Sequence, residues 1–348
     1  MLNLPKLSDF DLKGKRVILR VDIDVPFEKT VNETGASNYK IVDFTRINTW
    51  KPTVKYLLQK EVEQVILIGH IGRPLEEGKD KISTFAIKIP DLALSWWPDN
   101  LKGDGGPLKQ QDGEPKVNLL ENLRFYEGEE SNDPEFAKKL ASFGDFYINE
   151  AFADSHRSHA SIVGIPKLLP HAAGFHLASE IENLSKVLSD PKKPTLLVIS
   201  GVKEDKVEMI KKARAVFDRV LVGGRLPEYL GEDYADPKIL VAKLNPDKED
   251  ITLNSIEAFE KEIASAGTIV LAGVPGKYEE PGQTLGTERI FKSVASSSAF
   301  KIVGGGDSLA VVSKYDLSSK FDWISVGGGA MLEFLIAGTL PGIEILLH

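Results

Sequence analysis

Short runs of apolar, β-branched residues alternate with segments of helical periodicity along almost the whole chain. Such alternation is typical of βαβ units, in which helices cover both faces of a parallel sheet. Ten strands are many for one small sheet, and 348 residues are enough for two cores. The sequence therefore predicts an α/β protein with two doubly wound, Rossmann-like parallel-sheet domains. Strands are predicted at residues 16–25, 65–70, 117–124, 146–152, 195–201, 220–224, 239–244, 268–273, 300–304 and 323–327, and helices at residues 45–60, 133–143, 178–188, 206–217, 255–266, 287–296 and 330–337.

The boundary between the two predicted domains falls near a helix at residues 178–188. This helix places Ile181, Leu184 and Leu188 on one stripe, and prolines follow it. Residues 98–115, which are rich in Gly, Asp and Gln, are predicted to form an irregular surface loop. We expect a first domain at residues 1–172, a hinge helix at residues 173–193, a second domain at residues 194–335, and a tail at residues 336–348 that packs back on the first domain.

Composition and charge exclude several classes of function. A formal net charge of −8 leaves no basic excess for general binding of nucleic acids. The absence of cysteine excludes disulfides, thiolate metal sites and cysteine nucleophiles. No apolar run approaches the length of a membrane span, and the N-terminus lacks the apolar core of a signal peptide. We therefore expect a cytoplasmic protein with neither a nucleic-acid nor a membrane partner.

Two glycine triplets stand where a predicted strand turns into a helix. The triplet at residues 304–306 precedes Asp307 and Ser308, and the second triplet occupies residues 327–329. Glycine lets the backbone approach a phosphate closely, and the N–H groups of the following helix favour the anion. Asp307 adds a carboxylate suited to a Mg²⁺ ion bound to nucleotide phosphates. Each triplet alone could be a tight strand–helix turn, but two so close in sequence indicate phosphoryl chemistry.

Basic side chains gather near the carboxyl ends of the predicted strands in the first half of the chain. In an open α/β sheet the ligand crevice lies beyond these strand ends. Guanidinium groups there match the geometry of phosphate and carboxylate groups. Any one of these residues alone could form a surface ion pair, but five basic segments in one half favour a pocket for a multiply anionic small substrate. The basic residues are Arg20, Arg46, His70, Arg73, Arg124, His156, Arg157 and His159.

The ordered motifs of the chain resemble those of the phosphoglycerate kinase family from about residue 12 to residue 346. The segments that carry the resemblance are RVDIDVP (20–26), DFTRIN (43–48), GHIGRP (69–74), LLENLRF (119–125), NEAFADSHRSHAS (149–161), AAGF (172–175), GVKEDK (201–206), GGGDS (304–308) and SVGGGAMLE (325–333). The resemblance implies a first domain for phosphoglycerate, a second domain for Mg-nucleotide, and a hinge between them. It also implies a monomer that binds 3-phosphoglycerate or 1,3-bisphosphoglycerate and ATP or ADP.

The same resemblance assigns roles to individual residues. The residues assigned to phosphoglycerate are Asp22, Asp24, Arg46, His70, Arg73, Arg124 and Arg157. The residues assigned to the nucleotide are Gly201, Lys203, Lys206, Glu279, Gly304, Gly305, Gly306, Asp307 and Ser308, with Asp307 holding the metal and Glu279 the ribose hydroxyls. The residues assigned to catalysis are Arg46, Lys206, Gly305 and Gly328.

The implied reaction is direct transfer of the acyl phosphate of 1,3-bisphosphoglycerate to ADP. A carboxylate nucleophile in the reverse direction needs no general base, so catalysis rests on positioning and on neutralising charge. Arg46 and Lys206 supply that charge from different domains, together with Mg²⁺ and backbone N–H groups. The resemblance therefore implies domain closure around the substrates.

The chain departs from the family pattern mainly on the nucleotide side. The segment between Lys203 and Lys206 is one residue shorter than in the family's lysine loop, so we expect Lys206 to keep its place at a helix start and Lys203 to be displaced. Asp24 stands where asparagine is usual and should repel an anionic substrate unless a cation compensates. A catalytically impaired relative that binds phosphoglycerate or other proteins is therefore an alternative. A Rossmann dehydrogenase is not, because no G-x-G-x-x-G follows the first strand.

Overall fold

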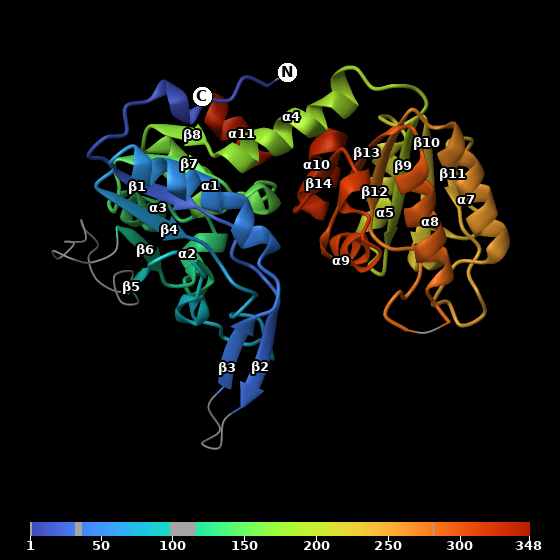
Figure 1. Cartoon of the computed structure of the whole chain (residues 1–348), viewed down its shortest axis with the longest axis horizontal. Coiled ribbons are helices and arrows are strands. Elements are labelled where there is room, and N and C mark those ends of the chain that lie inside the picture. The colour runs from blue at the N-terminus through green and yellow to red at the C-terminus, as the bar shows by residue number, and fades with distance from the viewer. Residues whose placement is uncertain (1, 32–36, 98–115, 281) are drawn as a thin grey trace. The chain divides into compact units, whose positions relative to one another are not determined.

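The computed structural model describes residues 2–31, 37–97, 116–280 and 282–348. These residues divide into two compact units (Figure 1). The N-terminal unit contains Leu2–Glu180 and Leu340–His348, and the C-terminal unit contains Ile181–Thr339. The division falls inside helix α4 (Phe175–Ser189). The predicted surface loop at residues 98–115 lies outside the described residues.

A parallel sheet forms the centre of the N-terminal unit. Its strands are β1 (Arg16–Arg20), β4 (Gln64–Ile68), β5 (Ser95–Trp97), β6 (Val117–Leu120), β7 (Phe146–Asn149) and β8 (His171–Ala173). In the described part of this unit the sheet has six strands in the order β5-β6-β4-β1-β7-β8. An antiparallel hairpin of β2 (Phe27–Val31) and β3 (Ser37–Ile41) extends away from it (Figure 1).

The side chains of β1 alternate between two environments, because successive residues of a strand point to opposite faces of the sheet. Val17 and Leu19 belong to a core cluster with Trp50 and Leu57 of α1 (Thr45–Gln59). The other face carries Arg20, which is completely buried. The remaining α-helices of this unit besides α4 are α2 (Glu127–Glu130), α3 (Pro134–Ala141) and α11 (Pro341–Glu344).

The C-terminal unit has the strand order of dinucleotide-binding folds. Its strands are β9 (Thr195–Gly201), β10 (Arg219–Gly224), β11 (Ile239–Val241), β12 (Thr268–Ala272), β13 (Phe300–Gly304) and β14 (Trp323–Ser325). They pair in parallel in the order β11-β10-β9-β12-β13-β14. The order of strand addition reverses between β9 and β12, and ligands of such sheets bind beyond the carboxyl ends of the strands at this point.

Helices pack on both faces of the second sheet (Figure 1). They are α5 (Lys206–Ala213), α6 (Leu226–Leu230), α7 (Leu253–Ser265), α8 (Leu285–Ser296), α9 (Gly306–Lys314) and α10 (Gly328–Ala337). Helices α7 and α8 contact each other, as do α5 and α10. Phe259 and Phe291, from α7 and α8, join Val198 and Leu271 of the strands in one buried core. The predicted doubly wound α/β class is confirmed.

Several predicted elements differ in extent from those observed. The predicted strand at residues 16–25 ends at Arg20, where β4 stops pairing with it. Val21, Ile23 and Val25 are nevertheless buried, so their apolar pattern reflects burial rather than strand pairing. The sequence did not predict the β2–β3 hairpin, because its residues are largely exposed. It also did not predict β5 and β8, because each is only three residues long. In the described part of the chain no single helix is long and apolar enough to cross a membrane, and α10 with the segment Pro341–Leu347 meets that criterion only as a bent pair.

Candidate functional site

Arg46 lies in the first turn of α1, beside the residues that follow β1. Its Nη1 donates hydrogen bonds to Asp22 Oδ1 at 3.3 Å and to the Asp24 carbonyl at 2.9 Å. No hydrogen bond joins its other guanidinium nitrogens to the described residues, and the side chain is 29% exposed. One edge of the guanidinium is therefore fixed while the rest remains able to contact an anion.

The hydrogen bonds of His70 determine its tautomer. Arg20 Nη2 lies 3.1 Å from His70 Nδ1. Since a guanidinium can only donate, Nδ1 must be the acceptor. Burial lowers the pKa of His70 well below its ordinary value, so the ring is neutral near pH 7 and carries its proton on Nε2. That buried Nε2 has no hydrogen-bond acceptor among the described residues, and its closest carboxylate oxygen, Asp24 Oδ2, is 3.8 Å away.

Asp154 connects the buried Arg20 to the partly exposed Arg157. Both belong to the arginine crevice, the strand-end cluster that also contains Asp22, Asp24, Arg46, His70 and Arg124. One carboxylate oxygen accepts a hydrogen bond from Arg20 at 3.0 Å, and the other lies 3.3 Å from Arg157 Nη1. Burial alone would raise the pKa of Asp154, but His70 in its protonated form and the positive charges of Arg20, Arg157 and Arg124 lower it overall. Since His70 is neutral near pH 7, the three arginines account for the lowering at that pH. Asp154 is therefore ionised, and it forms an ion pair with Arg157.

Asp22 has one oxygen that is paired and one that is not. Oδ1 takes the bond from Arg46, whereas the buried Oδ2 has no hydrogen-bond partner within the described ranges. Burial raises the pKa of Asp22 to about 6, although Arg46 opposes the shift. A buried polar atom without a partner is costly. These two atoms favour a ligand that donates a hydrogen bond to Asp22 Oδ2 and accepts one from His70 Nε2.

A backbone amide holds the carboxylate of Asp24, the residue that departs from the family pattern. Its Oδ1 accepts a hydrogen bond from the Gly72 amide at 2.8 Å, and Arg46 holds its carbonyl. The carboxylate is 40% exposed, so solvent screens part of its charge.

Arg124 is buried, whereas Arg73 is exposed. Arg124 Nη1 donates to the Gly72 carbonyl at 2.7 Å, and its Nε lies 3.0 Å from Glu130 Oε1. Arg73 is exposed and pairs with Glu76 at 3.0 Å. The two arginines line a hollow of about 130 Å³. Direct contacts thus join Asp22, Asp24, Arg46 and His70. Asp154 connects Arg157 to this group, and Gly72 connects Arg124 to it, whereas Arg73 lies at the edge.

The sequence did not identify the buried layer that supports this crevice. Arg20 also donates to Ser161 Oγ at 2.9 Å, and Ser161 in turn bonds to the buried Glu129. Tyr147 donates its hydroxyl to the Ser161 carbonyl at 2.7 Å. The available signal was a charged residue ending an apolar strand, because a buried arginine requires partners. The partners come from distant segments, so the sequence could not name them.

In the C-terminal unit Lys206 opens α5, as the sequence predicts, and reaches back over the end of β9. Its ammonium donates to the Ser200 carbonyl at 2.7 Å. Gly201 gives it room, because a Cβ there would lie 2.8 Å from Nζ. Burial lowers the pKa of Lys206, with Asp205 and Asp307 opposing the shift. Lys203 is exposed in the short turn before the helix.

The two glycine triplets meet at neighbouring helix starts. Helix α9 begins at Gly306, and Gly305 precedes it with a φ of 101° that favours glycine. Helix α10 begins at Gly328, where a Cβ would lie 2.6 Å from the Gly305 Cα. Both N-termini therefore need glycine to approach each other, and together they form an electropositive backbone surface.

Ser308 and Asp307 have different surroundings in the first turn of α9. Ser308 is buried, and its Oγ accepts a hydrogen bond from the Gly273 amide at 2.9 Å. Asp307 is exposed. Glu279 is also exposed and lies beside Tyr278, where burial and the charges of Glu279 and Asp307 raise the pKa of the phenol to about 12. Gly304 ends β13 directly before this turn.

Basic side chains at strand ends in one α/β unit and paired glycine turns in the other are typical of enzymes that bind phosphates. The family model for phosphoglycerate kinase matches residues 7–231 and 238–338. The chain therefore belongs to the phosphoglycerate kinase family. It is a kinase that transfers the acyl phosphate of 1,3-bisphosphoglycerate reversibly to ADP, giving 3-phosphoglycerate and ATP.

Individual relatives agree over their full lengths. The chain is 35% identical to the phosphoglycerate kinase of Dictyoglomus turgidum, over 98% of this chain and 97% of that protein. It is 33% identical to a phosphoglycerate kinase of Thermus thermophilus, over 98% of this chain and 99% of that protein. The solved phosphoglycerate kinase structure from Coxiella burnetii matches with a TM-score of 0.77 at 29% identity, covering 99% of both chains. That from Pyrococcus horikoshii matches with a TM-score of 0.79 at 28% identity, covering 98% of both.

Proposed function

We propose that this kinase requires Mg²⁺ and that each unit binds one substrate. In this proposal the arginine crevice of the N-terminal unit holds the phosphoglycerate, and the glycine turns of the C-terminal unit hold the nucleotide. The supporting observation is a pair of buried atoms in the arginine crevice, Asp22 Oδ2 and His70 Nε2. Neither has a hydrogen-bond partner among the described residues. Asp22 Oδ2 can accept a hydrogen bond from a hydroxyl group, and the Nε2–H of His70 can donate to an anionic oxygen.

Arg46, Arg124 and Arg157 supply the positive charge that a phosphoglycerate needs. Asp154 and the backbone hold these guanidiniums, so little reorganisation is required when substrate binds. We assign Arg46 to the transferring phosphoryl group because only one edge of its guanidinium is used by the described residues. Arg73, which is exposed and only loosely held, contributes to binding rather than to the chemical step.

The residues of the C-terminal unit fit a Mg-nucleotide. Mg²⁺ is usually held by one or two carboxylates together with substrate phosphates, and Asp307 offers an exposed carboxylate beside two helix N-termini. When bound, Mg²⁺ neutralises charge on the phosphate oxygens. Lys206 and the backbone amides of Gly305, Gly306 and Gly328 bind the phosphates, and Glu279 accepts from the ribose hydroxyls.

In the chemical step the phosphoryl group moves in line from the C1 carboxyl oxygen of 1,3-bisphosphoglycerate to an oxygen of the terminal phosphate of ADP. The P–O bond to the carboxyl oxygen breaks, which releases the carboxylate of 3-phosphoglycerate, and a P–O bond to ADP forms. No proton must be removed from either nucleophile, so the residues act by orientation and charge. Arg46 and Lys206 supply positive charge to the equatorial oxygens. The monomeric state expected from the resemblance remains part of this proposal.

A coupled assay with 1,3-bisphosphoglycerate and ADP tests the metal assignment. Asp307→Asn should raise the Mg²⁺ concentration for half-maximal rate by at least about tenfold, which corresponds to about 1.4 kcal/mol. The KM for phosphoglycerate should stay unchanged. Asp233→Asn, at an exposed carboxylate of the same unit, is the matched control.

The outcomes separate the proposal from its alternative. An unaltered Mg²⁺ requirement in Asp307→Asn would remove Asp307 from the metal site. A folded wild-type protein without turnover at saturating substrates and Mg²⁺ would instead favour the impaired relative.

A further inference from the structure

A second hollow in the N-terminal unit lies away from the arginine crevice. It has a volume of about 780 Å³ and is bordered by strand β3 and by residues 81–96. Four aromatic side chains line it, namely Tyr39, Phe44, Phe85 and Trp96. None of the crevice residues Asp22, Arg46, His70, Arg124 and Arg157 borders it. The hollow is therefore distinct from the proposed phosphoglycerate site.

Three lysines give this aromatic hollow a positive charge. Lys40, Lys81 and Lys88 border it, and no acidic residue is among the described residues of its lining. None of these three lysines forms an ion pair with a carboxylate of the residues that the structure describes. On the same hairpin, by contrast, Lys29 pairs with Asp80 at 2.5 Å. In a chain with a net charge of −8, three such lysines around one hollow favour an anionic occupant.

Phe85 and Trp96 form the wall of this hollow. Their ring centroids are 4.6 Å apart, and Phe85 is 61% exposed. Trp96 is fixed by a hydrogen bond from its Nε1 to Thr84 Oγ1 at 3.1 Å. The exposed aromatic surface is thus held in place before any ligand binds, which reduces the entropy cost of binding.

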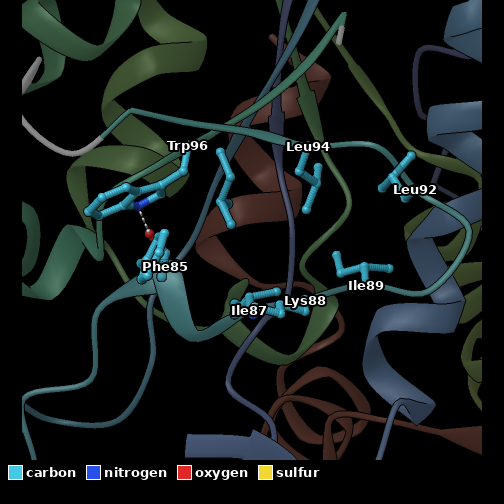
Figure 2. Close-up of a pocket in the computed structure, with 9 residues that line it drawn as sticks. Phe85, Ile87, Lys88, Ile89, Leu92, Leu94 and Trp96 are labelled. Carbon is cyan, nitrogen blue, oxygen red and sulfur yellow. Dashed lines mark hydrogen bonds between the residues drawn. The ribbon is translucent and has the colours of Figure 1, made fainter. Parts of the chain in front are cut away.

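A second, more apolar pocket shares part of this wall. Phe85, Lys88 and Trp96 line both hollows, and the second has a volume of about 270 Å³. Figure 2 shows Ile87, Ile89, Leu92 and Leu94 around it. Phe85 and Trp96 therefore border both an apolar pocket and the lysine-lined hollow.

We propose that the aromatic–lysine hollow binds a small planar aromatic anion. Stacking on Phe85 and Trp96 covers the exposed ring surface, and Lys40, Lys81 and Lys88 neutralise the charge. An inorganic phosphate would leave the aromatic wall uncovered. An uncharged apolar ligand would make no use of the three ammonium groups and would hinder their hydration.

The test uses 8-anilinonaphthalene-1-sulfonate as the probe, with 3-phosphoglycerate and Mg-ADP present at saturation so that the substrate sites are filled. Fluorescence titration of the full chain should show one saturable site. Lys88→Glu and Phe85→Ala should each weaken probe binding by at least about tenfold. Lys261→Glu, at an exposed lysine of α7, should leave it unchanged. Catalytic turnover of each variant reports whether it is folded.

Several results would overturn the proposal. One is unchanged affinity for the probe in both folded variants, Lys88→Glu and Phe85→Ala. Another is an affinity for the uncharged analogue N-phenyl-1-naphthylamine that equals the affinity for the probe. If the probe binds only when 3-phosphoglycerate and Mg-ADP are left out, it occupies the substrate sites instead. Concentration-dependent association that Phe85→Ala abolishes, measured by sedimentation, would instead identify a second copy of the chain as the occupant of this hollow.

Discussion

At the scale of single residues, the crevice shows how buried charge is kept functional. Arg20 is completely buried, and Asp154, Ser161 and His70 satisfy it. The same contacts give His70 an acceptor Nδ1 and a donor Nε2. Arg46, by contrast, is held by the described residues at one nitrogen only. The residues that support the site are thus saturated with partners, while those assigned to substrate keep unused hydrogen-bonding capacity.

We expect Arg46→Ala to lower kcat by at least about a hundredfold while the affinity for Mg-ADP stays nearly intact, because removal of one preorganised charge donor typically costs about 3 kcal/mol in the transition state. Steady-state kinetics and nucleotide titration measure both quantities. Arg73→Ala is the comparison and should mainly raise the KM for phosphoglycerate. A full kcat in Arg46→Ala would show that another residue supplies the charge.

The two lysines of the short loop should behave differently. Lys206 is half-buried and bonded to the Ser200 carbonyl, whereas Lys203 is exposed. Lys206→Ala should abolish transfer, because loss of a well-placed bond to phosphate costs about 1.5–3 kcal/mol. Lys203→Ala should weaken Mg-ADP binding only slightly, because we expect Lys203 to be displaced from the nucleotide. Titration of Mg-ADP against both variants decides this. A loss of more than about tenfold in Lys203→Ala means that the short turn has adapted to bring Lys203 to the nucleotide.

At the scale of elements, the start of α4 depends on a carboxylate from another part of the chain. Glu150 follows β7 and is buried, and its oxygens accept from the amides of His176 at 3.1 Å and Leu177 at 3.0 Å. Thr53 of α1 donates a hydrogen bond to the same carboxylate. Glu150 therefore caps α4 and connects it to the helix that carries Arg46.

Gly174→Ala should destabilise this junction. A Cβ at Gly174 would lie 2.1 Å from Glu150 Oε2, so the carboxylate would have to leave the cap. We expect the free energy of unfolding to fall by about 2–4 kcal/mol, the sum of overpacking and loss of a cap. Denaturant unfolding measures it. Gly329→Ala, in α10 where a Cβ meets nothing within 4 Å, should be neutral or slightly stabilising. Equal stability of the two variants would contradict the assigned role of Glu150.

At the scale of the whole molecule, each unit has its own sheet, core and ligand-binding edge. The segment Leu340–His348 belongs to the N-terminal unit although the chain reaches it last. Gly342 donates its amide to the Ser155 carbonyl at 2.8 Å and accepts from Asn149 at 3.3 Å. The C-terminus thus supports the loop that carries Asp154 and Arg157.

Hydrogen exchange can test the assignment of one substrate to each unit. Because a bound ligand suppresses local opening, 3-phosphoglycerate should protect amides at residues 20–25, 69–73 and 122–125. Mg-ADP should protect residues 200–207 and 304–309. Mass spectrometry of peptides from each unit, with each ligand alone, measures the protection. Protection of residues 304–309 by 3-phosphoglycerate, with none at residues 20–25, would reverse the assignment.

The fold class and the family could both be predicted from the amino-acid sequence, whereas the roles of the glycine turns and the strand-end basic residues stay predictions. Strand and helix periodicities are local, and a glycine turn or a strand-end arginine is visible in a few consecutive residues. Strand ends were less predictable, because residues 21–25 have the apolar pattern of a strand but are buried without continuing the ladder. The hairpin was missed because most of its residues are exposed and lack an apolar face.

Which side chains share a partner depended instead on the three-dimensional arrangement of the chain. Arg20, His70 and Asp154 come from three separate strand ends, and their contacts fix a tautomer and a charge state that no local pattern encodes. The same holds for Glu150, which caps a helix that begins well beyond it in sequence, and for the lysines gathered around Phe85 and Trp96. Electrostatic and hydrogen-bond energies depend on distances across the fold, whereas the periodicities that specify strands and helices depend on neighbours along the chain.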